Sequence, residues 1–228
     1  MKYSFLPILF MVPAFGLNNS IVDPGLAELV QKIDEKTETI TTIRAKFYQR
    51  KDLSIMTEPL ELSGNFFLKK PDGIKFSAVA EDDLILVITE TEVVSLSPKA
   101  KKATHLELKK RRDFLTQHLL SKKLEAMLAY FTISKTVQPD DDGNHHLVLT
   151  PIKRKYKKKF DSIHLWVNAD HLIYKVHVHE PDGDINRLEL TDIEINVDID
   201  SAEFATNIPE GYEMGDRLSL LFGSDFGF

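Results

Sequence analysis

The sequence has 228 residues, of which 43% are hydrophobic and 28% are charged. This balance is typical of a folded protein and excludes a chain that is disordered throughout. A formal net charge of −6 argues against nucleic acid as the main partner. No repeat, linker or low-complexity segment divides the chain, so we expect one large domain rather than two small ones.

Residues 1–16 have the pattern of a secretory signal peptide. A lysine precedes the apolar run 5–15, and Ala14-Phe15-Gly16 forms a small-x-small cleavage site. The alternative is an uncleaved membrane anchor. The run is shorter than the roughly 20 residues that a spanning helix needs, and Pro7 and Pro13 interrupt it. We therefore expect cleavage at this site.

The chain contains no cysteine. Disulfides therefore cannot brace the exported domain, residues 17–228, and its stability must come from burial alone. A bacterial lipoprotein also needs a cysteine at its cleavage site to carry its acyl chains. We thus expect a mature protein that has no lipid anchor of this kind and is soluble outside the inner membrane.

An amphipathic helix is predicted to begin at Asp23-Pro24. Asp23 is a favoured N-cap residue, and proline is tolerated at the first helical position because its missing N–H would have no intrahelical partner. The pattern fades through the threonine-rich stretch 37–42, and a strand begins at Ile43. Four apolar residues at helical spacing predict one buried stripe: Leu26, Leu29, Val30 and Ile33.

Most of the remaining chain reads as strands separated by short turns, which predicts an antiparallel meander. Strands and helices do not alternate, so a parallel nucleotide-binding sheet is not expected. One turn has a clear mechanism, because Pro71 presets φ and Gly73 tolerates positive φ. The predicted strands are 43–50, 60–70, 73–79, 83–89, 92–97, 104–109, 130–137, 145–150, 160–168, 171–179, 184–191 and 193–198.

Two short helices are predicted in the middle of the chain. The first lies at about 114–119, and Ser121 is the expected cap of the second. Helices inserted into a long meander have to lie on or across the sheet. Their apolar positions are Phe114, Leu115 and Leu119 in the first helix, and Leu124, Met127, Leu128 and Phe131 in the second.

The hairpin 64–76 is apolar on both faces. Phe66 and Leu68 point one way and Phe67 points the other, whereas a strand with one face in water should alternate apolar and polar residues. A barrel of about eleven strands is wider than its side chains can fill, so an apolar cavity under a helical lid fits this pattern. A filled core with helices packed on one face explains it equally well.

Histidines and catalytic motifs give no strong signal. If a turn lies near Ala169-Asp170, then His164, His177 and His179 share one face of a hairpin, and three imidazoles can bind zinc. Histidines on a solvated sheet face are commoner, so we expect no metal. Neither GxSxG, HExxH nor a glycine-rich phosphate loop occurs. We therefore expect a protein that is not an enzyme and has no cofactor.

Two further segments are distinctive. Residues 153–159 contain six basic residues in seven and lie between two predicted strands, so they form either a solvated hairpin tip or a contact with anionic lipid head groups or an acidic partner. The C-terminal residues 218–228 are rich in leucine and phenylalanine. We expect this tail to pack onto the barrel.

Several motifs together resemble those of the periplasmic outer-membrane lipoprotein carrier family, LolA, over roughly residues 24–214. Ile43–Gln49 is similar to the family's Phe-x-Gln strand, and Gly64–Pro71 is similar to its Gly-x-Leu-Trp-x-Lys-Arg-Pro. Further matching motifs are Leu147–Pro151, Glu180–Gly183, Ile199–Phe204 and Ile208–Gly211. Each motif is weak alone, but their order and spacing agree with the family.

The resemblance implies an unclosed antiparallel β-barrel of about eleven strands, with a concave apolar face covered by about three helices. In the family, an arginine before the conserved proline hydrogen-bonds the lid; here Lys70 holds that position as the expected lid latch, without the planar guanidinium fork. Ile74 and Phe76 match family pocket positions. The residues expected to bind lipid are Phe47, Phe66, Leu68, Ile74, Phe76, Leu86, Ile88, Leu119, Met127 and Leu128.

The resemblance also implies a function. The chain would be a periplasmic chaperone that takes acylated lipoproteins from an inner-membrane ABC transporter and passes them to an outer-membrane receptor, acting as a monomer. An acyl chain left in water costs about 0.8 kcal/mol per methylene, so a carrier must bury it. The alternatives are a carrier of another lipid or glycolipid, and a lipid-sensing regulatory module on the same fold.

Overall fold

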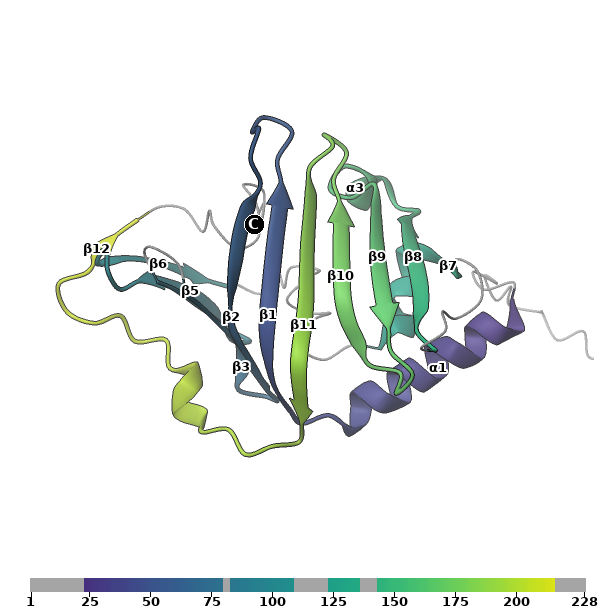
Figure 1. Cartoon of the computed structure of the whole chain (residues 1–228), viewed down its shortest axis with the longest axis horizontal. Helices are drawn as coiled ribbons and strands as arrows, with labels where there is room; N and C mark the ends of the chain where they lie inside the picture. Colours follow the sequence, from purple (N-terminus) through teal and green to yellow (C-terminus); the bar gives the residue numbers. More distant parts are fainter. Residues whose placement is uncertain (1–22, 80–82, 109–122, 136–142, 216–228) are drawn as a thin grey trace, which may run out of the picture.

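The computed structural model describes residues 23–79, 83–108, 123–135 and 143–215. These ranges form one twelve-stranded sheet with the order β12-β6-β5-β4-β3-β2-β1-β11-β10-β9-β8-β7 (Figure 1). Neighbouring strands are antiparallel, except that β12 runs parallel to β6. Because β12 and β7 are edges, the sheet is open, as predicted. The predicted signal peptide, the helix at 114–119 and the C-terminal tail lie outside the described residues.

The strands agree closely with the predicted segments. The helices are α1 (Pro24–Thr39), η1 (Leu124–Ala129), α3 (Arg154–Lys157) and η2 (Ser201–Phe204), of which η1 and η2 are 3₁₀ helices. Within the described ranges, no helix is both long and apolar enough to span a membrane. The strands are β1 (Thr42–Asp52), β2 (Leu60–Lys69), β3 (Gly73–Ala78), β4 (Leu84–Ile88), β5 (Glu92–Ser97), β6 (Lys102–Glu107), β7 (Phe131–Lys135), β8 (His145–Pro151), β9 (Ser162–Val167), β10 (Ile173–His179), β11 (Ile185–Ile195) and β12 (Glu213–Met214).

One strand was predicted as two. The segments 184–191 and 193–198 form the single strand β11, which pairs with β1 along most of its length. The register shifts between Arg44 and Lys46, opposite the point where Asp192 has a φ of 50°. A bulge of this kind breaks the alternation of side chains, so the sequence pattern stops and restarts within one strand.

Helix α1 begins as predicted. The Asp23 carboxylate accepts a hydrogen bond from the Gly25 N–H at 2.9 Å, and Pro24 occupies the first turn. The predicted apolar stripe, together with Asp34, is buried. The turn that follows β2 also behaves as expected, because Gly73 has a φ of 150° and a Cβ there would collide with the Ile88 carbonyl group.

The second predicted helix is shorter and of another type. It is the 3₁₀ helix η1, and Phe131 starts β7 instead of ending the helix. The buried Asp34 carboxylate of α1 accepts the backbone N–H groups of Leu124 at 2.5 Å and Glu125 at 3.0 Å. This contact from a distant helix fixes where η1 begins, which spacing along the segment could not reveal.

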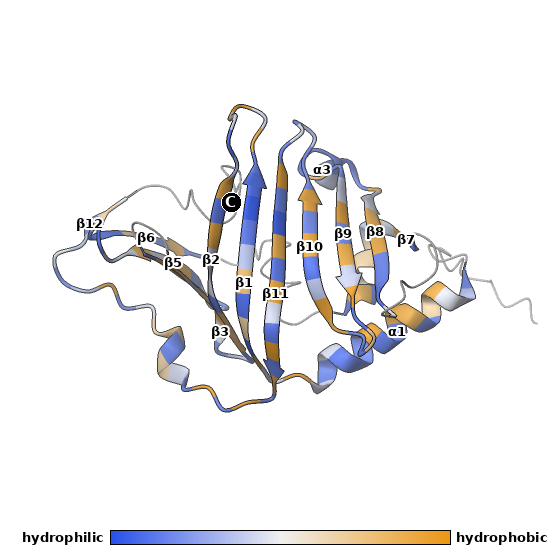
Figure 2. Cartoon of the chain, viewed as in Figure 1, coloured by the Kyte–Doolittle hydropathy of each residue, from blue (hydrophilic) through white to orange (hydrophobic). Residues whose placement is uncertain are grey.

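The two faces of the sheet differ in polarity. Hydrophobic and hydrophilic residues alternate along β1, β10 and β11 (Figure 2). Register places Phe47, Leu190 and Leu188 on one face, with Tyr48 and Glu189 on the other. We call the first the apolar face and the second the polar face. The apolar face carries two separate buried clusters, one on β1–β5 and one under α1 and η1.

Candidate functional site

The candidate lipid site is the buried cluster on the apolar face of β1–β5. Antiparallel register aligns its side chains in rows across β2, β3 and β4, because residues directly opposite one another share a face. One row is Phe66, Phe76 and Leu86; the next is Leu68, Ile74 and Ile88. The whole cluster, which we call the β1–β5 cluster, comprises Ala45, Phe47, Phe66, Leu68, Ile74, Phe76, Ala78, Leu84, Leu86, Ile88 and Val93.

Three phenylalanines form the middle of this cluster. Phe76 lies edge-on to Phe47, with ring centroids 5.2 Å apart, and at 5.1 Å from Phe66 in a similar arrangement. Edge-to-face rings contact one another without hydrogen bonds, so the surface is apolar and non-directional. Seven of the ten predicted lipid-binding residues meet here. Their contact with lipid stays a prediction.

The position of Phe67 explains why the hairpin 64–76 has apolar residues on both faces. Its side chain lies on the opposite face of β2, where Val87, Ile199 and Phe204 are buried together. Phe204 belongs to η2, so the segment that follows β11 covers this part of the sheet from outside. The apolar patch around Phe67 on the polar face therefore packs against the protein's own chain.

Two of the other predicted lipid-binding residues lie outside the β1–β5 cluster. Met127 and Leu128 lie on η1 and pack against the second cluster, which contains the buried stripe of α1 and apolar residues of β7–β9. Asp34 holds η1 beneath α1 and so directs both residues there. Their contact with lipid, like that of Phe66, stays a prediction. Leu119 lies outside the described residues.

Lys70, the predicted lid latch, contacts helix α1. Its Nζ donates a hydrogen bond to the Thr37 carbonyl oxygen at 2.8 Å, in the last turn of α1. A cation there also interacts favourably with the helix dipole. Burial lowers the pKa of Lys70, and the Glu38 carboxylate partly offsets this. A lysine thus joins the β2–β3 turn to α1; its part in cargo release stays a prediction.

Polar residues that sequence reasoning missed mark one end of the apolar face. Lys51 follows Phe47 and Gln49 on the same side of β1 and is buried, with only 4% of its surface exposed. Burial lowers the pKa of Lys51 to about 8, against the opposing attraction of Glu180. Gln49 Nε2 donates to the Asn186 Oδ1 at 2.8 Å. The sequence pattern that could have revealed these residues is the alternation along 47–51, which places Gln49 and Lys51 on the same side of β1 as Phe47.

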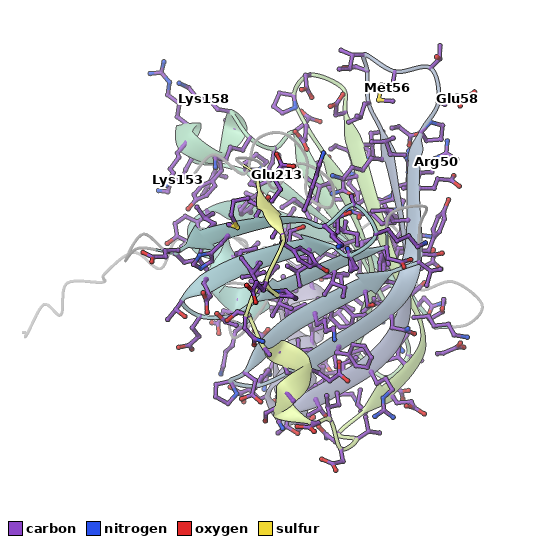
Figure 3. All side chains as sticks on the ribbon, turned by 90° about the vertical axis from the view of Figure 1, so that its left-hand side faces the viewer. Arg50, Met56, Glu58, Lys153, Lys158 and Glu213 are labelled. Atoms are coloured by element: carbon purple, nitrogen blue, oxygen red, sulfur yellow. The ribbon has the colours of Figure 1, made fainter. Side chains whose placement is uncertain are left out.

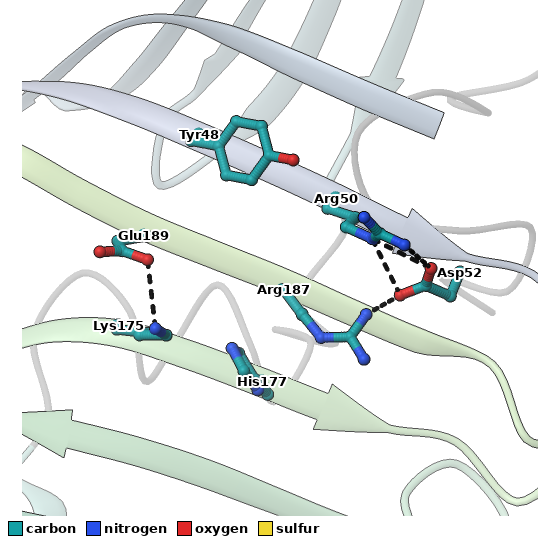
Figure 4. A pocket seen from close by; sticks show the side chains of 7 residues that line it. All are labelled: Tyr48, Arg50, Asp52, Lys175, His177, Arg187 and Glu189. Carbon is teal, nitrogen blue, oxygen red and sulfur yellow. Dashed lines mark hydrogen bonds and ion pairs between the residues drawn. The ribbon is translucent and has the colours of Figure 1, made fainter. Parts of the chain in front are cut away.

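The polar face carries a groove of about 480 Å³ (Figure 4). Asp52 lies between Arg50, whose Nη2 is 2.9 Å from its Oδ1, and Arg187. Lys175 pairs with Glu189 at 3.2 Å. These charges largely neutralise one another across β1, β11 and β10, so the groove is best explained as an ion-pair network of the sheet.

The predicted histidine face exists and is wider than expected. His164 lies opposite His177 in the β9–β10 pairing, and His146 of β8 stacks on Trp166 at 4.4 Å between centroids. His164 and His179 stack at 4.6 Å. Burial is the main cause that lowers the pKa of His146, His164 and His177. Stacked rings do not converge on a point, and within the described ranges no three His, Asp or Glu side chains could hold a metal ion.

Comparisons with known proteins agree with this architecture. The model of the family "Outer membrane lipoprotein carrier protein LolA" matches residues 38–207. A search of curated proteins found no match. An uncharacterized conserved protein from Thermus thermophilus is similar in structure, with a TM-score of 0.53 and 11% identity over 85% of this chain and 99% of its own.

Two more solved structures show a weaker likeness, with lower TM-scores. MucB gives a TM-score of 0.50 at 8% identity, over 82% of this chain and 64% of its own. A LolA superfamily protein from Nitrosomonas europaea gives 0.39 at 13% identity, over 77% and 97% of the two chains. At these identities the likeness concerns the fold alone. The family model, in contrast, spans most of the chain, and on that ground the protein belongs to the outer membrane lipoprotein carrier protein LolA family.

Proposed function

We propose that this protein is a periplasmic, non-enzymatic carrier that binds the acyl chains of lipoproteins and moves them from the inner to the outer membrane. The observation that carries the proposal is the β1–β5 cluster, a continuous cluster of buried apolar side chains with three phenylalanines at its centre on a LolA-family sheet. Acyl chains need apolar contacts that can be released, and these side chains would offer such contacts.

The ends of this surface differ chemically, which supports an amphipathic ligand. Near the start of β1, the neighbouring residues Phe66, Leu68 and Ile74 of β2 and β3 are apolar. Near the end of β1, Gln49 and Lys51 are polar. An acyl ligand would place its chains on the phenylalanines and its polar end toward Lys51. Partners in this proposal are an inner-membrane lipoprotein-releasing ABC transporter and an outer-membrane lipoprotein receptor, and the signal peptide delivers the chain to the periplasm.

The test is transfer of a triacylated lipoprotein. Membranes containing the transporter are incubated with ATP and the exported protein, and the soluble complex is measured by gel filtration and native mass spectrometry. Phe66→Gln is compared with Phe67→Gln, a change of the same type one residue away on the opposite face of β2. We expect Phe66→Gln to weaken the complex about tenfold and Phe67→Gln to leave it within about twofold of wild type.

Different results would point elsewhere. A different lipid co-purifying with the protein would make it a carrier of that lipid. Lipoprotein that binds but is never passed to outer-membrane vesicles would favour a lipid-sensing regulatory module. A protein that takes up no lipid, while circular dichroism shows it folded, would overturn the proposal.

A further inference from the structure

One end of the sheet collects exposed apolar side chains. The loop 53–59, which joins β1 and β2, carries Ile55 and Met56 with 90% and 45% of their surfaces exposed. Leu60 at the start of β2 and Ile152 just before α3 are also exposed. Four of the seven large exposed hydrophobic residues in the described ranges thus lie at this end of the sheet. We call this end the hairpin rim.

The same rim carries the basic run 153–159. The run forms α3 and its flanks between β8 and β9, and five of its six cationic side chains are exposed. Figure 1 shows α3 at the end of the sheet that also bears the β1–β2 loop, and Figure 3 shows Met56, Lys153 and Lys158 projecting at this end. The exposed apolar residues and the cationic cluster therefore lie at the same end of the sheet.

Hydrogen bonds connect the parts of the rim. The Ser54 N–H donates to the Asp184 Oδ1 at 2.6 Å, which joins the β1–β2 loop to the β10–β11 turn. The Asp161 N–H donates to the His179 carbonyl oxygen at 2.8 Å, which joins the chain after α3 to the end of β10. The rim is one continuous surface rather than three separate loops.

An apolar track leads from this rim into the β1–β5 cluster. Alternate residues of β2 point to the apolar face: Leu60 is exposed, Leu62 is half-buried, Gly64 has no side chain, and Phe66 and Leu68 are buried. Residues that alternate along a strand share a face. An apolar group that enters at Leu60 would therefore meet Leu62, which packs against the β1–β5 cluster, and then pass Gly64 to reach Phe66. On β1, Lys51 and Gln49 lie opposite Leu60 and Leu62.

We propose that the hairpin rim docks on a bilayer containing anionic phospholipid, with Ile55 and Met56 entering the interface and the basic run 153–159 on the head groups. Exposed apolar tips beside clustered lysines are the combination that interfacial membrane binding uses. The β10–β11 turn, which lies between the β1–β2 loop and α3, carries the acidic residues Glu180, Asp182 and Asp184. Electrostatic attraction to the anionic head groups is therefore concentrated at α3. Docking here would present the Leu60 track to the membrane.

Vesicle flotation tests the proposal on protein purified from the periplasm without cargo, so the outcome is independent of the carrier function. Vesicles of phosphatidylethanolamine with phosphatidylglycerol are compared with vesicles of phosphatidylcholine. We expect binding to the anionic vesicles that weakens as salt rises, and little binding to phosphatidylcholine. The double change Ile55→Ser with Met56→Ser should lower the partition coefficient about tenfold or more. Met214→Ser, which changes an exposed methionine of the edge strand β12, is the control and should leave binding nearly unchanged.

Charge is tested with matched variants. Lys155→Glu with Lys158→Glu should lower binding to the anionic vesicles by about tenfold or more, since each lysine near such a surface contributes about fivefold. Lys101→Glu with Lys102→Glu changes the net charge equally, where the β5–β6 turn meets the start of β6, and should have a much smaller effect. Absence of vesicle binding by the wild type, or equal losses in test and control pairs, would overturn the proposal. So would retention on an acidic partner protein without vesicle binding.

Discussion

Gly64 provides the sharpest test of how the candidate site is built. It pairs with Ala78 of β3 and with Phe47 of β1, so it lies within the β1–β5 part of the sheet. A Cβ at this position would lie 2.8 Å from the Ala78 Cα and 2.9 Å from the Ser77 carbonyl carbon, and it would collide with the Ser77 oxygen. Glycine in a strand often marks such a close approach of another backbone.

The expected cost of Gly64→Ala follows from these contacts. Carbon atoms normally pack at about 3.5–4.0 Å, so β2 and β3 would have to separate by roughly 1 Å. The colliding atoms are backbone, which cannot move aside by changing a rotamer. Overpacking costs about 1–3 kcal/mol, and we expect the upper end, about 3 kcal/mol, in the free energy of unfolding.

Urea unfolding of the two forms measures this difference. Trp166 is the only tryptophan and lies on β9, far along the sheet from β2, so its fluorescence reports whether the whole sheet unfolds. Gly25→Ala is the control, because its nearest contact is the Asp23 Oδ1 at an ordinary 3.4 Å and alanine favours helix. That variant should be neutral or gain up to about 1 kcal/mol. A Gly64→Ala protein within about 1 kcal/mol of wild type would refute the close approach of β2 and β3.

Three further predictions concern the helices and the polar face. Asp34→Ala should lower the free energy of unfolding by about 2 kcal/mol in urea titrations, because two η1 N–H groups lose their acceptor; Asp34→Asn should lose less, and equal losses would contradict the capping role. Lys70→Met should release the end of α1, seen as faster amide hydrogen exchange at Thr37–Thr39, whereas unchanged exchange would exclude a latch. The pKa of His177 is lowered to about 4, chiefly by burial and then by Lys175, so the unfolded state binds more protons between about pH 6.5 and 4 and stability should fall as the pH falls through that range. The denaturation midpoint of His177→Gln should depend less steeply on pH there; an identical slope would show that His177 does not contribute.

The sequence by itself determined most of the secondary structure and the family. Alternation in β1–β6 and β7–β10 placed strands within a few residues of their observed bounds, and Asp23-Pro24 placed the start of α1. The motifs around Gly64–Pro71 pointed to the LolA family, which the family model confirms. Periodicity records which residues share a face of one strand, because side chains alternate with a fixed period of two.

Only the tertiary structure decided which apolar faces meet. The sequence could not show that Phe67 packs under η2 while Phe66 joins Phe47 and Phe76, since adjacent phenylalanines point to opposite faces of β2 and their partners come from distant segments. Nor could the sequence show that Met127 packs against the second cluster, because the contact of Asp34 with η1 spans 90 residues of sequence. Local patterns carry no record of such distant contacts. Strand register and long-range hydrogen bonds therefore determine which residues meet at the candidate site, whereas local sequence patterns determine the strands and helices that carry them.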